Sequence, residues 1–219
     1  YRIYGTNVPA RIISGDYYEY IPLDGNWLGV VIADVSGKGV SAGLMMATCR
    51  SALRAAVAEA SPAEALASVN RQLFPDMRED MFISMAYLIL EYGSGGLTLA
   101  RAGHDAPLVY RKATKKVEVL KPGGLALGVD EGPVFERVTN NAEAQLDPGD
   151  CLLLYTDGVN EAQNGEEEEF GKERMLQVFQ EAAELGAEEV VKSLQREVDE
   201  FVGDNVQMDD ITLIAIEKR

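Results

Sequence analysis

Short strand-like runs dominate this sequence, and helical periodicity is confined to two blocks of the chain. The runs are rich in β-branched, aromatic or leucine residues and are bounded by glycine, proline or aspartate, which is typical of strands. They cover Arg11–Ile21, Trp27–Asp34, Phe82–Glu91, Leu97–Ala102, Leu108–Arg111, Val117–Leu120, Val134–Asn140, Cys151–Tyr155 and Ile211–Ile216. Between two of them, Gly93-Ser94-Gly95-Gly96 predicts a hairpin turn.

The helical blocks cover about Val40–Ala60 with Pro62–Phe74, and Lys172–Ala183 with Ala187–Val202. In the first block, Leu66, Val69 and Leu73 recur at the spacing of one helix face. Many strands with two helix pairs predict an α+β fold, an α-β-β-α sandwich of two antiparallel sheets flanked by helix pairs. A parallel, doubly wound sheet would need strict alternation of strands and helices, which this sequence lacks.

Length and composition suit one large globular domain spanning residues 1–219, since 47% of the residues are hydrophobic and 26% charged. The net charge is −16, so neither nucleic acid nor an anionic membrane is an expected partner. No apolar run approaches the roughly 18 residues that cross a bilayer, so we expect no membrane insertion of this domain. Cys49 and Cys151 are the only cysteines, which argues against a disulfide scaffold and predicts a cytoplasmic location. Because the chain starts at Tyr1 and not at methionine, we expect it to be excised from a longer regulatory protein.

Four segments share one design, an aspartate beside an apolar run and usually a glycine. They are Ser14-Gly15-Asp16, Ala33-Asp34-Val35-Ser36-Gly37-Lys38-Gly39, Tyr155-Thr156-Asp157-Gly158 and Asp209-Asp210-Ile211-Thr212. Aspartate beside glycine is also common in turns, so one such segment alone is weak evidence. Four of them at strand ends predict that the carboxylates converge at one rim of the sandwich. Because packed carboxylates repel one another, we expect a divalent cation there, and all-oxygen ligation favours Mg²⁺, Mn²⁺ or Ca²⁺ over Zn²⁺.

Together with Ala102-Gly103-His104, these segments stand in the order found in the PPM (type 2C-like) metal-dependent protein phosphatases. They resemble specifically the bacterial branch of the sporulation stage II E and RsbU regulators. The resemblance covers nearly the whole chain, from about Pro9 to Ile216. The motifs are specific as a set, although none of them is specific alone.

The resemblance implies a ligand set for two divalent cations, Mn²⁺ or Mg²⁺. Asp16 and Asp34 would hold the first metal, with Asp34 bridging. Asp157 and Asp209 would complete the second metal site, and the backbone carbonyl of Val35 would add a ligand. The same four aspartates would carry catalysis through a metal-activated water, with no covalent phosphoenzyme.

The resemblance also implies the reaction, which is hydrolysis of phosphoserine or phosphothreonine on a regulatory protein of the anti-sigma-factor antagonist type. It implies an upstream sensor domain as a further partner. Two alternatives stay open from the residues themselves. One is a non-catalytic partner-binding module with the same fold, and the other is a different two-metal hydrolase such as a phosphodiesterase. Phosphodiesterases usually bring histidines to their metals, whereas this chain has one histidine.

Four further residues are candidates for chemistry, and three of them, Lys38, His104 and Asp210, also have a structural interpretation. Ser36 stands where eukaryotic type 2C relatives carry a histidine, and Lys38 precedes the helix predicted from Val40. Both are candidates for the substrate side of the site, although Lys38 also suits a solvated turn. His104 is either a general acid or a structural residue that anchors a turn between two strands, and the structural role is favoured. Asp210 is a weaker ligand candidate than Asp209, because it also suits a cap or turn.

Overall fold

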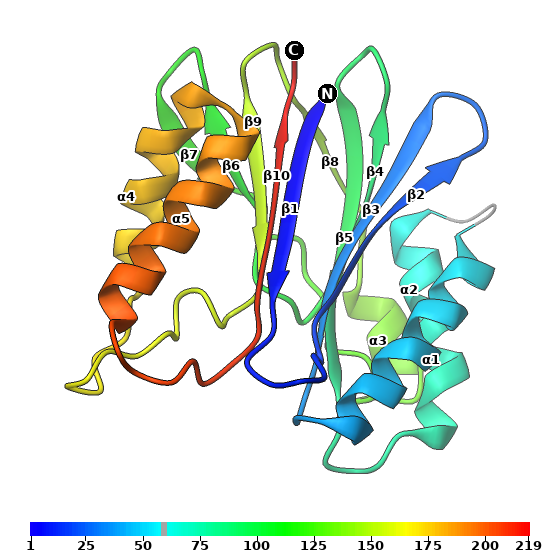
Figure 1. Cartoon of the computed structure of the whole chain (residues 1–219). Helices are drawn as coiled ribbons and strands as arrows, with labels where there is room; N and C mark the ends of the chain where they lie inside the picture. The colour runs from blue at the N-terminus through cyan, green and yellow to red at the C-terminus, as the bar shows by residue number, and fades with distance from the viewer. Residues whose placement is uncertain (58–60) are drawn as a thin grey trace. The chain divides into compact units, whose positions relative to one another are not determined.

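The computed structural model describes residues 1–57 and 61–219, and the chain divides into two compact units. The first unit is built from Tyr1–Ala10, Pro107–Leu120 and Leu146–Arg219, and the second from Arg11–Ala106 and Lys121–Gln145. Each unit contains one five-stranded antiparallel sheet with its own pair of helices (Figure 1). The α+β class, the two antiparallel sheets and the helix pair on each are therefore confirmed.

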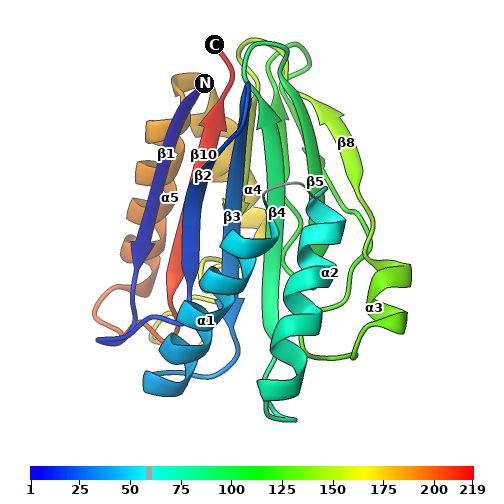
Figure 2. The same ribbon diagram turned by 90° about the vertical axis from the view of Figure 1, so that its right-hand side faces the viewer.

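The sheet of the second unit has the strand order β2-β3-β4-β5-β8. Its strands are β2 (Tyr17–Leu23), β3 (Trp27–Val35), β4 (Ile83–Glu91), β5 (Gly96–Ala102) and β8 (Ala142–Gln145). Its helices are α1 (Val40–Ala56), α2 (Pro62–Leu73), the 3₁₀ turn η1 (Phe74–Asp76) and the short α3 (Pro133–Val138). Figure 2 shows α1 and α2 side by side over one face of this sheet.

The core of the second unit lies between these two helices and the sheet. Side chains alternate along a strand, and Val31, Ala33 and Val35 share the face of β3 that the helices cover. They belong to one buried cluster with Leu53 of α1 and Leu66 of α2. The strand that ends at Val35 is thereby fixed by packing up to its last residue.

The sheet of the first unit has the strand order β1-β10-β9-β6-β7. Its strands are β1 (Arg2–Val8), β6 (Leu108–Arg111), β7 (Lys116–Val119), β9 (Cys151–Tyr155) and β10 (Ile211–Glu217). The helices α4 (Lys172–Ala182) and α5 (Ala187–Val202), joined by the 3₁₀ turn η2 (Ala183–Leu185), cover one face of it (Figure 1). Leu153, Tyr155 and Leu213 of the sheet are buried in one cluster with Phe179 of α4 and Leu194 of α5.

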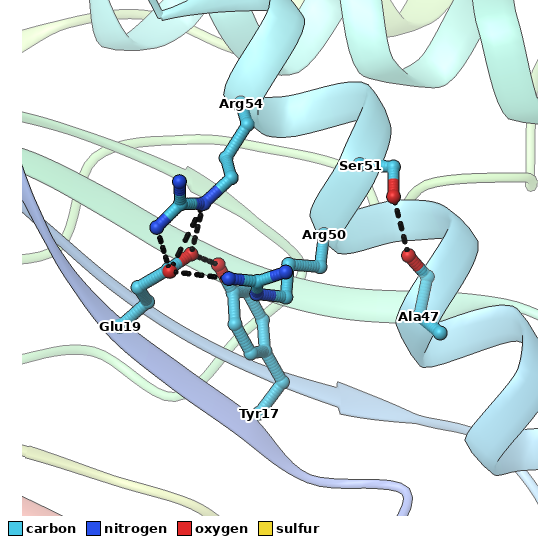
Figure 3. A network of polar contacts seen from close by, with 6 residues as sticks. All are labelled: Tyr17, Glu19, Ala47, Arg50, Ser51 and Arg54. Atoms are coloured by element: carbon cyan, nitrogen blue, oxygen red, sulfur yellow. Dashed lines mark hydrogen bonds and ion pairs between the residues drawn. The ribbon is translucent and has the colours of Figure 1, made fainter.

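One carboxylate ties α1 to β2 in the second unit, as Figure 3 shows. Glu19 of β2 accepts hydrogen bonds from Arg50 Nη2 at 2.9 Å, from Arg54 Nε at 3.0 Å and from the Tyr17 hydroxyl. Burial opposes ionisation of Glu19, but the hydrogen bonds from Arg54, Tyr17 and Arg50 outweigh it and lower the pKa of Glu19 from 4.5 to about 2. The helix that follows the Asp34 loop is therefore held to the strand that follows Asp16.

Several predicted elements need correction. Val134–Asn140 was expected to be a strand, but Pro133–Val138 forms helix α3. The β-branched residues of this segment favoured a strand and obscured the signals that start a helix. Asp130 Oδ1 accepts hydrogen bonds from three backbone amides at 2.8–3.0 Å, and proline occupies the first turn of the helix. The strand predicted from Arg11 begins only at Tyr17, and strands β1 and β8 were not predicted.

The remaining elements agree with the expectations within a few residues, and β6, β9 and α5 have the predicted bounds. The helix predicted as Val40–Ala60 ends at Ala56, and residues 58–60 lie outside the described residues. Within the described part of the chain, every helix is too short or too polar to cross a bilayer.

Candidate functional site

In the second unit, the sheet register brings two of the predicted ligands together. Strand β2 pairs with β3 so that Tyr17 faces Ala33, and the next pair in that register is Asp16 with Asp34. Side chains directly opposite each other in an antiparallel pair have Cβ atoms about 4.5–5.5 Å apart. Asp16 is buried at 5% exposure, while Asp34 is partly buried. Two carboxylates are thus held as neighbours at the end of a sheet, where like charges are unfavourable without a counterion.

Gly15 allows the chain to pass close to the carbonyl of Val35. A Cβ atom on Gly15 would lie 3.0 Å from the Val35 carbonyl oxygen, tighter than an ordinary contact. This close approach is what the register predicts, because Gly15 is the residue opposite Val35. The backbone amide of Asp16 also donates to Ser14 Oγ at 3.1 Å, which fixes the turn into β2. Two carboxylates and one main-chain carbonyl therefore lie in adjoining register positions of this strand pair.

Strand β4 continues this row of polar residues. Asp34 is paired with Ser84, and Ser84 Oγ lies 2.7 Å from Nδ1 of His104. His104 is buried at 3% exposure, and its carbonyl oxygen accepts a hydrogen bond from the Arg101 guanidinium. Contacts at both its ring and its backbone support the structural role for His104. Ser84 carried no sequence motif, and only the pairing of β3 with β4 reveals its position between Asp34 and His104.

The loop between β3 and α1 carries the two residues considered for the substrate side. Ser36 is bonded to Phe82 in both directions, since its amide donates to the Phe82 carbonyl at 3.0 Å and its Oγ accepts from the Phe82 amide at 2.8 Å. Lys38 is exposed between Gly37 and Gly39, whose φ angles are 92° and 80°. The Ser36 side chain thus helps to fix the loop, whereas the Lys38 side chain is exposed.

In the first unit, the strands β9 and β10 bring the other two aspartates into one neighbourhood. Tyr155 is paired with Leu213, and beyond them the Thr212 amide donates to Thr156 Oγ1 at 2.9 Å. Asp157 follows Thr156 at the end of β9, and Asp209 stands shortly before β10 begins at Ile211. Both aspartates are partly buried.

Gly158 has the same role here that Gly15 has in the second unit. A Cβ atom on Gly158 would lie 2.0 Å from the carbonyl oxygen of Asp210, so no other residue fits without moving the backbone. Asp210 itself is engaged in the fold, because its Oδ1 accepts from the amide of Ala10 at 2.7 Å. This contact supports the turn or cap interpretation of Asp210. The amide of Asp210 also donates to Asp209 Oδ1 at 2.9 Å, which orients the Asp209 carboxylate.

The four predicted ligands fall as two pairs, Asp16 with Asp34 in the second unit and Asp157 with Asp209 in the first. Within either unit, the described residues contain no group of three or more histidine, cysteine, aspartate or glutamate side chains arranged to hold a metal ion. The chemistry of the donors fits a hard cation, because each pair consists of carboxylates and has a backbone carbonyl beside it. In each pair a glycine packs against that carbonyl, tightly at Gly15 and with no room for a side chain at Gly158.

Comparison with known proteins agrees with this pattern. The family model described as "Stage II sporulation protein E (SpoIIE)" matches residues 24–219. Among curated proteins, protein IcfG of Synechocystis is 28% identical over 95% of this chain, and phosphoserine phosphatase RsbU of Bacillus subtilis is 29% identical over 97% of it. The chain spans only 36% of the length of IcfG and 62% of that of RsbU.

A solved structure shows the same fold. The SiaA-PP2C domain of Pseudomonas aeruginosa matches 99% of this chain, over 85% of its own length, with a TM-score of 0.86 and 23% sequence identity. At this level of identity the likeness concerns the fold.

Proposed function

The chain belongs to the stage II sporulation protein E (SpoIIE) family, and from this membership we propose that it is a metal-dependent protein serine/threonine phosphatase. The observation that carries the proposal is the position of Asp16 and Asp34, each one residue beyond the Tyr17–Ala33 pair of β2 and β3, with Gly15 packed against the Val35 carbonyl. RsbU, a relative over nearly the whole chain, is named a phosphoserine phosphatase. We carry that reaction to this chain as a single catalytic domain spanning residues 1–219.

The proposed ligand set is the one that the sequence motifs imply. Asp16 and Asp34 would hold one divalent cation, with Asp34 bridging, Asp157 and Asp209 would complete a second, and the carbonyl of Val35 would add a ligand. When bound, Mn²⁺ or Mg²⁺ ions supply Lewis-acid activation of water and of the phosphate ester. The aspartates relieve their mutual repulsion in the same event, which gives the site its affinity for the cation.

The other residues of the proposed site would position the substrate. Lys38 is exposed in the loop before α1, and the backbone on either side of it has open space around it, because a Cβ placed on Gly37 or Gly39 meets nothing within 4 Å. Ser36 would hold that loop in place through its two bonds to Phe82. His104 would keep Ser84 oriented beside Asp34 without touching the substrate.

We further propose that the substrate is a phosphorylated regulatory protein of the anti-sigma-factor antagonist type, in the cytoplasm, and that an upstream sensor domain controls the enzyme. The support for this part is the family and its relatives rather than any single contact. The non-catalytic module with the same fold is the outcome against which this proposal is tested.

The test is phosphate release from a phosphoserine peptide by the metal-stripped chain, with Mn²⁺, with Mg²⁺ and with excess EDTA. Release should require one of the two cations and should stop when EDTA is added. Full turnover in excess EDTA contradicts the metal-dependent mechanism. No release under any condition, with the fold intact by circular dichroism, favours the non-catalytic module.

A further inference from the structure

A small pocket opens beside one of the two aspartate pairs, within the first unit. Its volume is about 160 Å³, and Gly158 and Asp209 form part of its lining. One wall is the segment that follows β9 and contains Glu161 and Glu169, and the other is the segment between α5 and β10. The pocket therefore adjoins one residue of the proposed metal site, Asp209, and the chain neighbour of another, Gly158 beside Asp157.

Hydrogen bonds fix both walls of the pocket. On one side, the amide of Phe170 donates to the carbonyl of Ala162 at 2.8 Å, which closes the glutamate-rich loop back on the segment after β9. On the other side, Gln207 Nε2 donates to the carbonyls of Val8 at 2.9 Å and Asp209 at 2.7 Å. Hydrogen bonds therefore hold the backbone on both sides of the pocket.

The outer wall presents apolar side chains to water. Val206 is 77% exposed and Met208 is 64% exposed, and both line the pocket. Scattered exposed apolar residues are ordinary, but these two alternate along one segment and border a single cavity. Covering such side chains with an aliphatic group of another chain is favourable, at about 25 cal/mol per Å² of apolar surface removed from water.

The rim of the pocket is acidic. Glu161 and Glu169 are both exposed at its edge, and Asp209 is the third carboxylate. If Asp209 is assigned to the metal, Glu169 is the exposed carboxylate that an incoming chain meets at the rim. It favours a basic residue and disfavours an acidic one, in the manner of charged groups at the rim of an interface.

The size of the pocket and its position select the occupant. Small-molecule sites typically hold roughly 300–1,000 Å³, so a pocket of about 160 Å³ suits one side chain better than a free ligand. An extended peptide advances about 3.3 Å per residue, so a phosphoserine at the aspartates places its near neighbours at this pocket. We propose that the pocket receives an aliphatic side chain within two residues of the phosphoserine, and that its acidic rim selects a basic residue beside it. This inference rests on the proposed phosphatase function.

Three phosphoserine peptides test it: one with leucine and lysine within two residues of the phosphoserine, one with the leucine replaced by serine, and one with the lysine replaced by glutamate. Loss of the leucine should lower kcat/KM about tenfold, the effect of burying or exposing most of one aliphatic side chain. Loss of the lysine should lower it about fivefold, an effect that high salt should largely remove. Affinity for the matching phosphonate peptides, measured by titration calorimetry, should follow the same order.

Two variants and one control locate these preferences. Met208→Ser should reduce the ratio of kcat/KM between the leucine and serine peptides, and Glu169→Lys should reverse the preference for lysine over glutamate. Glu166→Lys introduces the same charge change in the same loop outside the pocket lining, and it should keep the wild-type ratios. Equal effects of Glu166→Lys and Glu169→Lys would mean that the preference for lysine comes from the overall charge of the loop and not from the rim of the pocket. That outcome would overturn the proposal.

Hydrolysis of p-nitrophenyl phosphate separates this inference from the function on which it rests. A chain that hydrolyses this aryl phosphate but treats all three peptides alike overturns the pocket proposal and leaves the phosphatase proposal standing. A chain that hydrolyses neither the aryl phosphate nor any peptide overturns both.

Discussion

Asp34 has a carboxylate neighbour on one side and a hydroxyl neighbour on the other. It follows Ala33 in β3, faces Asp16 by the register with β2, and is paired with Ser84 of β4. The aspartates could be recognised in the sequence because each stands next to a run of apolar strand residues. Ser84 could not be recognised, because its position depends on a pairing between strands that are distant in the chain. That the two aspartate pairs share a pair of cations stays a prediction.

Asp34→Asn should lower turnover about a thousandfold, or about 4 kcal/mol of activation free energy, because the bridging charge is lost while the volume is kept. In metal-free buffer the same variant should melt about 1–3 °C higher than the wild type, because the repulsion between Asp16 and Asp34 is removed. Added Mn²⁺ should raise the melting temperature of the wild type and not that of the variant. Phosphate release and differential scanning fluorimetry measure both effects.

Asp24→Asn is the control, since Asp24 is exposed in the turn at the other end of the β2–β3 hairpin. It should change neither turnover nor the response to Mn²⁺. Wild-type turnover in Asp34→Asn, or a lower melting temperature without metal, would contradict the assignment of Asp34 as a metal ligand that repels Asp16.

His104→Gln should lower stability more than it lowers turnover per folded molecule. The reason is the 2.7 Å contact of His104 Nδ1 with Ser84 Oγ in a buried position, which is worth about 1–2 kcal/mol. Ser84→Ala should cost a similar amount, and the double variant should cost less than the sum of the two, because they share one contact. Urea unfolding together with kcat per folded molecule provides the measurement. A thousandfold loss of kcat with an unchanged free energy of unfolding would instead make His104 catalytic.

At the scale of elements, every central strand could be predicted, whereas two of the four edge strands, β1 and β8, could not. β9 consists of fully buried residues, and its bounds were predicted correctly from its leucine-rich run. β1 contains glycine and asparagine and has no buried residue, and β8 is a four-residue Ala-Glu-Ala-Gln segment. Each pairs with one neighbour only, so backbone hydrogen bonds define these two strands and their own side chains give little signal.

The contact between α1 and β2 makes an element-scale prediction. Glu19→Gln should lower the free energy of unfolding at pH 7 by about 1–2 kcal/mol, because Glu19 accepts from Arg50, Arg54 and Tyr17 at a side-chain exposure of 13%. The pKa of Glu19 is lowered to about 2 from 4.5. The stabilisation is therefore complete above about pH 4.5 and is lost as the pH falls toward 2, so the difference between wild type and variant should shrink across that interval.

Asp80→Asn provides the matched control for this prediction. Asp80 pairs with Arg78 at 2.7 Å, but the two side chains are 67% and 70% exposed, so breaking the pair should cost almost nothing. Urea unfolding at several pH values compares the two variants with the wild type. A difference between wild type and Glu19→Gln that does not change between pH 7 and pH 3 would show that the ion pairs do not hold α1.

At the scale of the whole molecule, the two units interrupt each other in the chain. Three segments form the first unit and two form the second, so neither unit is one continuous stretch of sequence. The sequence predicted the number of sheets and of helix pairs from composition and periodicity. Which strands share a sheet could not be read from it, because β1 and β10, or β5 and β8, meet only through pairing between distant segments.

The reactivity of the two cysteine thiols reports whether the two units unfold together. Cys49 belongs to the core of the second unit and Cys151 to that of the first, and burial raises the pKa of each thiol to about 12. In the native state, both should therefore react very slowly with an aromatic disulfide reagent at pH 8. Because each unit is interrupted by the other, we expect Cys49→Ser and Cys151→Ser to expose their remaining thiol at the same rate and at the same urea concentration. Two different rates would show that the units open separately.

The pairing of the first strand with the last has a consequence for synthesis on the ribosome. β1 pairs only with β10, so Arg2 faces Glu217 and Val8 faces Ile211. During synthesis, β1 therefore lacks its strand partner until the residues of β10 have left the exit tunnel. A nascent chain that stalls between these two points has β1 and the β10-facing edge of β9 both exposed, and exposed edges recruit strands from other molecules. For this topology, translation speed between the codons for β1 and those for β10 becomes a determinant of yield.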